Sequence, residues 1–159
     1  MMLLKSYLFL LLSAVISCST IKSDIYQISS LGLIRKQHKV TTIEIYEKYE
    51  DALLGLNKFS HVLVCYWLHE NDTPEKRNIL QVYPRGDSQN PLHGVFATRS
   101  PVRPNLIGLS ICKILSIEGN IIQIDTIDAF DGSPVIDLKP YIPSIDSEVD
   151  VQVPEWVYR

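Results

Sequence analysis

Apolar residues beyond residue 24 are grouped in short segments whose spacing is typical of β-strands. Several segments mix β-branched and aromatic residues with polar ones, as half-buried strands do. Residues 59–68 instead form a continuous apolar run, which fits a strand buried on both faces. The predicted strands are residues 25–34, 41–46, 59–68, 79–83, 95–98, 106–117 and 121–127. The pattern therefore predicts a mainly β fold.

The other segments predict connections between these strands. Residues 47–56 carry four apolar residues at helical spacing and predict one short helix. Residues 118–120 (Glu-Gly-Asn) predict a hairpin turn, and the charged residues 71–78 predict a surface loop. The tail after residue 141 holds prolines among acidic residues, and we expect its aromatic end to pack against the body.

The first 18 residues resemble an export signal. Lys5 gives a positive start, residues 7–16 are almost wholly apolar, and Ser17-Cys18 has the form of a lipoprotein cleavage site. We therefore expect a membrane-anchored lipoprotein, tethered through Cys18. An uncleaved anchor, a first barrel strand, or a start codon placed too far upstream, which would leave the protein cytoplasmic, are the alternatives.

Composition narrows the class of protein. A chain of 159 residues with 46% hydrophobic residues can bury one core of ordinary size. The net charge of −3 gives no overall positive field, so a nucleic acid would have to bind at a local patch. The three cysteines are far apart and contain no C-x-x-C pair, which argues against a zinc site and a dense disulfide framework.

Two arginines and two prolines form a stiff loop at residues 99–104, a common place for binding groups. Arginine suits carboxylates and phosphates because its planar fork donates two parallel hydrogen bonds. Alternatively, these arginines lie in a solvated loop and pair with acidic residues such as Asp131 or Asp137.

An acidic cluster covers residues 125–134. Its carboxylates could bind a metal, accept ribose hydroxyls, or cap a turn. A metal is the least favoured because the calcium-loop spacing is missing, so we expect none. His61 and His69 flank the apolar run, and such a histidine is either a hydrogen-bonded core residue or a catalyst.

Several common enzyme signatures are missing from the sequence. It contains no G-x-G-x-x-G, P-loop, G-x-S-x-G or H-E-x-x-H motif. Rossmann-type cofactor binding, nucleotide hydrolysis and the common hydrolase mechanisms therefore lose most of their support.

A series of short motifs is similar to those of the TrmO family, also called TsaA-like or YaeB-like proteins, over about residues 28–143. The motifs are FSH (59–61), WLH (67–69), PRG (84–86), GVFATRSP (94–101), RPN (103–105), IGLS (107–110), DAFDGSPV (128–135) and DLKPY (137–141). The resemblance implies a compact single-sheeted β-barrel with one or two short helices. It also implies S-adenosylmethionine as cofactor, a homodimer, and N6-methylation of threonylcarbamoyladenosine in tRNA.

The resemblance also implies roles for individual residues. The implied cofactor-binding residues are His69, Glu70, Arg99, Leu109, Ile127, Asp128, Ala129 and Phe130. The implied substrate-binding residues are Arg85, Arg103 and Asn105. No residue stands out as a general base, and Asp131 is the best available candidate for a catalytic role.

This chain departs from the family pattern near the first strand. Residues 33–40 pass almost directly into the next strand, where family members carry a longer segment that closes over the cofactor. The predicted organisation is an export segment (1–18), a linker (19–24), a TrmO-like barrel (25–143) and a tail (144–159). The alternative to a methyltransferase is a non-catalytic, exported binding module that keeps the barrel.

Overall fold

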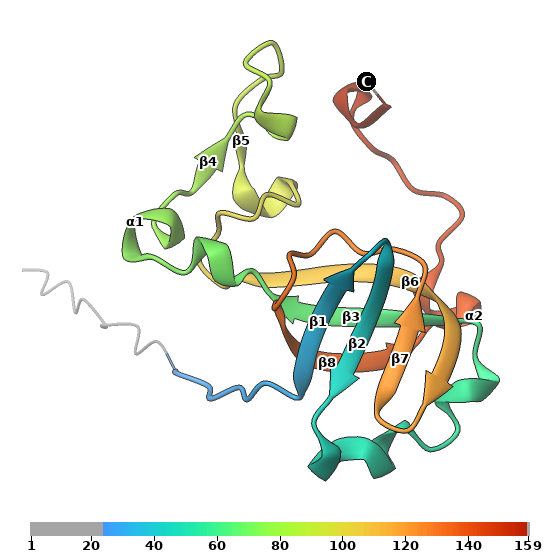
Figure 1. Cartoon of the computed structure of the whole chain (residues 1–159). Helices are drawn as coiled ribbons and strands as arrows, with labels where there is room; N and C mark the ends of the chain where they lie inside the picture. The colour runs from blue at the N-terminus through green and yellow to red at the C-terminus, as the bar shows by residue number, and fades with distance from the viewer. Residues whose placement is uncertain (1–23, 159) are drawn as a thin grey trace, which may run out of the picture.

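Six strands of this chain form one closed barrel in which every pair of neighbours is antiparallel (Figure 1). The computed structural model describes residues 24–158, so the predicted export segment and Cys18 lie outside the described residues. In barrel order the strands are β1 (Gly32–Gln37), β2 (Val40–Ile45), β7 (Ile121–Ile124), β6 (Ile107–Glu118), β3 (His61–Trp67) and β8 (Pro134–Pro140). The predicted mainly β barrel is confirmed.

The barrel interior is filled by alternating side chains. On β3, Val62, Val64 and Tyr66 are buried while their neighbours are partly exposed, which is the period-two pattern of a strand with one face on a core. The prediction that this strand is buried on both faces was therefore wrong. Gly32 is required where β1 meets β2, because a Cβ there would lie 2.2 Å from the Glu44 carbonyl oxygen. The buried core consists of Ile34, Ile43, Ile45, Val62, Val64, Tyr66, Cys112, Ile122, Ile124, Ile127, Ala129 and Val135.

A long excursion, here called the arm (residues 68–106), connects the neighbouring strands β3 and β6. The Leu68 N–H donates a hydrogen bond to the Leu106 carbonyl at 2.8 Å and closes the base of the arm. Its elements are η3 (His69–Asn71), α1 (Pro74–Arg77), β4 (Gln81–Val82), η4 (Pro84–Gly86), β5 (His93–Gly94) and η5 (Val95–Ala97). Strands β4 and β5 pair only with each other within the described residues.

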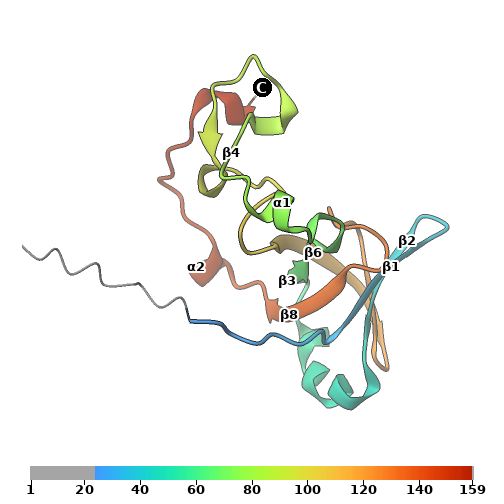
Figure 2. The same cartoon turned by 90° about the vertical axis from the view of Figure 1, so that its left-hand side faces the viewer.

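The arm and the C-terminal tail extend beyond the same end of the barrel (Figures 1 and 2). The tail carries α2 (Pro143–Asp146) and η6 (Glu155–Tyr158). Trp156 Nε1 lies 3.2 Å from His93 Nε2, and the Arg85 guanidinium donates to the Val157 carbonyl at 2.6 Å. The predicted packing of the aromatic end of the tail is therefore confirmed, and the arm is the part of the body that it contacts.

Two short 3₁₀ helices, η1 (Glu47–Leu53) and η2 (Leu56–Lys58), connect β2 to β3 at the opposite end. The prediction of one continuous helix over residues 47–56 was wrong, because Gly55 adopts a left-handed conformation (φ 86°) between the two pieces. Within residues 24–158, no helix is both long and apolar enough to cross a bilayer.

Three strand predictions need correction. Residues 25–31 form no strand, and Ile25 is 94% exposed; the first strand starts at Gly32. Residues 95–97 form a 3₁₀ turn in place of the predicted strand. Strand β8 was not predicted, because prolines at both ends and two charged residues inside it hide its pattern.

Candidate functional site

A cavity of about 560 Å³, here called the barrel-mouth cavity, lies where the arm joins the barrel. Its size falls within the range of roughly 300–1,000 Å³ that is usual for small-molecule sites. Two segments far apart in sequence line most of it: the Arg/Pro loop with the start of β6 that follows it, and the turn before β8. Its lining residues are Lys36, Tyr66, Leu68, Asn71, Thr98, Arg99, Pro101, Arg103, Ile107, Gly108, Leu109, Ser110, Asp128, Ala129, Phe130 and Ser133.

Tyr66 joins the barrel core to the cavity wall. Its ring is only 4% exposed, and its hydroxyl donates a hydrogen bond to the Asp128 carbonyl. Burial is the main reason that the pKa of Tyr66 is raised, so the phenol stays protonated near neutral pH and remains a donor. Gly108 leaves room for this ring, because a Cβ at that position would lie 2.4 Å from it. Tyr66 therefore fixes the position of the turn at Asp128.

Lys36 of β1 holds the same turn from the other side. Its ammonium donates to the Ile127 carbonyl at 2.8 Å, and its backbone N–H donates to Asp131 Oδ1, also at 2.8 Å. The carboxylate of Asp131 thus anchors the turn to β1, and Asp131 is outside the residues that line the barrel-mouth cavity. The acidic residue among those that line the cavity is Asp128.

The two arginines of the stiff loop behave differently. Arg103 is partly buried and its guanidinium lies 3.5 Å and 3.4 Å from the Thr98 and Ser100 carbonyls, so it holds the loop together. Arg99 is exposed, and among the residues from 24 to 158 its guanidinium has no hydrogen-bond or ion-pair partner. The pairing of these arginines with Asp131 or Asp137 does not occur, because Asp131 binds Lys36 and Asp137 pairs with Lys139 at 2.8 Å.

The remaining candidates from the sequence lie around or outside the cavity. His69 and Glu70 are outside the residues that line it, although His69 Nδ1 lies 3.2 Å from the hydroxyl of the buried Ser133, which does. Ile127 belongs to the core, and Asn105 is exposed with its carbonyl bonded to the Ile107 N–H. Arg85 lines a neighbouring cavity. Arg99, Leu109, Asp128, Ala129, Phe130 and Arg103 do line the barrel-mouth cavity.

Sequence reasoning missed several residues of the cavity wall, notably Lys36, Tyr66, Ser110 and Ser133. For Tyr66 a signal was present: a glycine inside a strand marks a close approach, and Gly108 faces Tyr66 in the β3–β6 pairing. Lys36 carried no such signal, because a lysine on a β-strand usually points to solvent.

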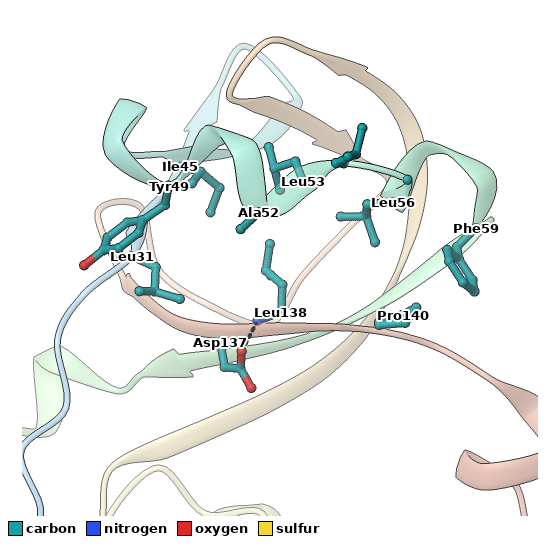
Figure 3. Close-up of a pocket in the computed structure, with 12 residues that line it drawn as sticks. Leu31, Ile45, Tyr49, Ala52, Leu53, Leu56, Phe59, Asp137, Leu138 and Pro140 are labelled. Carbon is teal, nitrogen blue, oxygen red and sulfur yellow. Dashed lines mark hydrogen bonds between the residues drawn. The ribbon is translucent and has the colours of Figure 1, made fainter.

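An apolar hollow of about 320 Å³ lies at the other end of the barrel, beneath η1 and η2 (Figure 3). Leucines, Ile45, Tyr49 and Phe59 dominate its wall, and Asp137 is its only charged residue among those described. The Asp137 carboxylate accepts a hydrogen bond from the Leu138 N–H at 2.9 Å. This hollow lacks convergent polar groups, so the barrel-mouth cavity is the better candidate for a site that binds a charged molecule.

No three side chains of the His, Cys, Asp and Glu types are grouped closely enough to hold a metal ion in the part of the chain that the structure describes.

Comparison with known proteins gives consistent results. A probable S-adenosyl-L-methionine-binding protein of Methanocaldococcus jannaschii is 44% identical over 121 residues, covering 76% of this chain and 96% of that protein. A tRNA (adenine(37)-N6)-methyltransferase of Mus musculus is 39% identical over 109 residues, 69% of this chain but 25% of the mouse protein. The crystal structure of TrmO from Pseudomonas aeruginosa superimposes with a TM-score of 0.66 at 26% identity, covering 86% of this chain.

This chain spans 63% of the length of that TrmO, slightly less than two thirds. Residues 30–147 match the family described as the tRNA-methyltransferase O N-terminal domain. This match covers both the barrel and the arm that together form the barrel-mouth cavity. The chain therefore belongs to the tRNA-methyltransferase O family, through its N-terminal domain.

Proposed function

We propose that this chain binds S-adenosylmethionine in the barrel-mouth cavity and transfers its methyl group to N6 of threonylcarbamoyladenosine in tRNA. Membership of the family and the names of the M. jannaschii and mouse relatives support a methyltransferase that uses this cofactor. The choice of tRNA as substrate rests on the mouse relative and on the resemblance of the motifs.

The observation that carries the proposal is the convergence of polar groups on one cavity of suitable size. Asp128 presents a carboxylate for the ribose hydroxyls or the ammonium of the cofactor, and Arg99 presents an unpaired guanidinium for its carboxylate. In this proposal the adenine edge meets the backbone of residues 128–130, which is supported by the hydrogen bonds of Tyr66 and Lys36 to this turn. When bound, S-adenosylmethionine supplies a methyl group on a positively charged sulfur.

The protein would contribute mainly by positioning. Methyl transfer needs donor and acceptor atoms held in line, and rigid placement of the reacting groups lowers the barrier substantially. The turn at Asp128 meets this requirement because two hydrogen bonds from β1 and one from β3 fix it.

Calorimetric titration of the full chain with S-adenosylmethionine tests the first half of the proposal. We expect micromolar binding, weakened by about 1.5–3 kcal/mol in Arg99→Ala, the range for a hydrogen bond to a charged group. Arg35→Ala is the matched control, because Arg35 pairs with Glu44 at 3.1 Å and lies away from the cavity. Unchanged affinity in Arg99→Ala would show that Arg99 does not contact the cofactor.

Incubation with methyl-labelled cofactor and tRNA tests the second half. We expect label in tRNA that carries threonylcarbamoyladenosine and none in tRNA that lacks this modification. A chain that binds the cofactor but labels neither tRNA would favour the alternative, a binding module that keeps the barrel.

A further inference from the structure

A second cavity, here called the arm cavity, adjoins the barrel-mouth cavity and has a volume of about 750 Å³. It lies between the arm and the end of the tail. Thr98, Arg99, Pro101 and Asp128 line both cavities, so these residues form a common wall. A molecule in the arm cavity would therefore lie directly beside one in the barrel-mouth cavity.

Aromatic side chains from three segments line the arm cavity. Tyr83 precedes η4, Phe96 lies in η5, and Trp156 lies in η6 of the tail. Phe96 is 79% exposed, so its ring is available to a molecule in the cavity. Flat aromatic faces of this kind are the usual platforms for unstacked nucleobases.

Arg85 supplies a positive charge at the same cavity. Its backbone adopts a left-handed conformation (φ 60°), which is uncommon for a residue other than glycine. Its guanidinium donates to the neutral carbonyl of Val157. Since hydrogen bonds to a phosphate are charge-assisted and stronger, an incoming phosphate would compete well for this guanidinium.

The tail forms one side of this cavity, and two contacts hold it to the arm. The Trp156 ring meets His93 edge-on, with ring centroids 5.3 Å apart and an angle of 65° between the planes, and Nε1 is within hydrogen-bond distance of His93 Nε2. The Arg85–Val157 hydrogen bond is the second contact. Without the tail, the arm cavity would lose Trp156 and Val157 from its lining.

We propose that the arm cavity receives the acceptor nucleotide of the RNA, with its base against Trp156 and Phe96 and a phosphate on Arg85. This assignment rests on the proposed function, because it places the acceptor beside the cofactor. Asp128 is the acidic residue that lines both cavities, so in this arrangement it faces N6 of the base. The tail thereby becomes part of the substrate site.

Fluorescence anisotropy with a labelled tRNA anticodon stem–loop tests the proposal in the full chain. We expect Trp156→Ala to weaken RNA binding about tenfold, since loss of a base-stacking partner has an effect of this order. Tyr158→Ala is the matched control: Tyr158 lies in the same helix, is exposed, and lines neither cavity. Calorimetry should show the same affinity for S-adenosylmethionine in both variants.

The outcomes separate this proposal from the proposed function. If Trp156→Ala binds the stem–loop as tightly as the unsubstituted chain, or if the unsubstituted chain binds the cofactor but no RNA, the assignment of the arm cavity is wrong. If the unsubstituted chain does not bind S-adenosylmethionine, the proposed function fails, and the RNA titration still tests the cavity.

Tryptophan emission gives a second measurement that does not depend on removing Trp156. The chain has two tryptophans, so Trp67→Phe leaves Trp156 as the only one. We expect the stem–loop to quench its emission as the base stacks on the ring. Full RNA binding by anisotropy without quenching would overturn the proposal.

Discussion

Tyr66 and Gly108 face each other across the pairing of β3 and β6, and together they shape the wall of the barrel-mouth cavity. Gly108 is buried directly against the phenol ring, so only a residue without a side chain leaves room for that ring. The ring can then reach the Asp128 carbonyl and hold the turn that we propose contacts the cofactor.

Replacing Gly108 by alanine should therefore disturb the site. A Cβ at 2.4 Å from the ring forces Tyr66 to move, and overpacking of this kind typically costs about 1–3 kcal/mol of stability. We expect a lower melting temperature and weaker binding of S-adenosylmethionine. Gly94→Ala is the control, because the nearest atom to its Cβ would be 3.9 Å away and its φ is negative. Equal melting temperatures for the two variants would contradict this account.

The buried thiol of Cys112 should make the stability of the fold depend on pH in the alkaline range. The thiol is fully buried, and burial raises its pKa from 9.0 to about 11. The unfolded chain loses this proton at lower pH than the folded one does. The contribution of Cys112 to the free energy of unfolding is therefore complete below about pH 9. It falls as the pH rises to 11, by up to about 3 kcal/mol.

The measurement is the free energy of unfolding by urea at several values between pH 8 and 11. Lysines and tyrosines titrate in the same range, so the quantity to compare is the difference in slope between the unsubstituted chain and Cys112→Val. We expect a shallower decline in the variant. Parallel curves would mean that the thiol does not titrate differently on folding.

Among the elements, β1 and the turn before β8 form one unit although about 90 residues separate them. The Lys36 ammonium and backbone N–H hold opposite ends of the turn, at Ile127 and Asp131. The short hairpin between β1 and β2 brings this lysine to the cavity wall, where longer relatives were expected to place a covering segment.

Lys36→Met should loosen the turn while leaving β1 paired. It removes the bond to the Ile127 carbonyl but keeps the backbone bond to Asp131. We expect the free energy of unfolding to fall by at most about 1.5–3 kcal/mol, the range for a hydrogen bond made by a charged donor, and cofactor binding to weaken because the turn is less firmly held. Lys39→Met, in the exposed hairpin turn, is the control and should bind as the unsubstituted chain does. Unchanged calorimetric affinity for the cofactor in Lys36→Met would show that the bond to Ile127 is not needed for binding.

Elements with a plain periodic pattern could be predicted from the sequence, and elements defined by distant partners could not. Strand β3 is a continuous apolar run, so its limits were found to within two residues. Strand β8 has only Val135 fully buried, and its place in the barrel depends on pairing with β3 and β1. Likewise the motifs located the Arg/Pro loop and the turn, whereas Lys36 joins the site only through contacts across the fold.

For the whole molecule, the exposed face of β6 is the clearest candidate interface. Ile107, Leu109 and Ile111 occupy alternate positions on one side of the strand and are at least 42% exposed, and Leu115, beyond the exposed Lys113, is 51% exposed. Leu109 also lines the barrel-mouth cavity, so a second copy on this face would lie beside the proposed cofactor. We therefore expect a homodimer in which each subunit covers part of the other's cavity.

Light scattering at micromolar concentration checks this expectation. Ile111→Lys should give a folded monomer with weaker binding of S-adenosylmethionine, because a charge in the centre of an apolar interface prevents close packing. Leu54→Lys, at the opposite end of the barrel and 95% exposed, should remain dimeric. An unsubstituted monomer that binds the cofactor would show that the site is complete within one chain.

The closed base of the arm suggests how such a protein can change its substrate. Because Leu68 and Leu106 are hydrogen-bonded neighbours, the intervening residues leave and rejoin the barrel at a single point between two adjacent strands. Insertions and replacements there need not alter the pairing of any barrel strand. The outer part of the arm, which carries Arg85 and the pair β4–β5, can therefore vary to accept new substrates, while Arg99 and the rest of the arm that lines the barrel-mouth cavity must be kept for the donor.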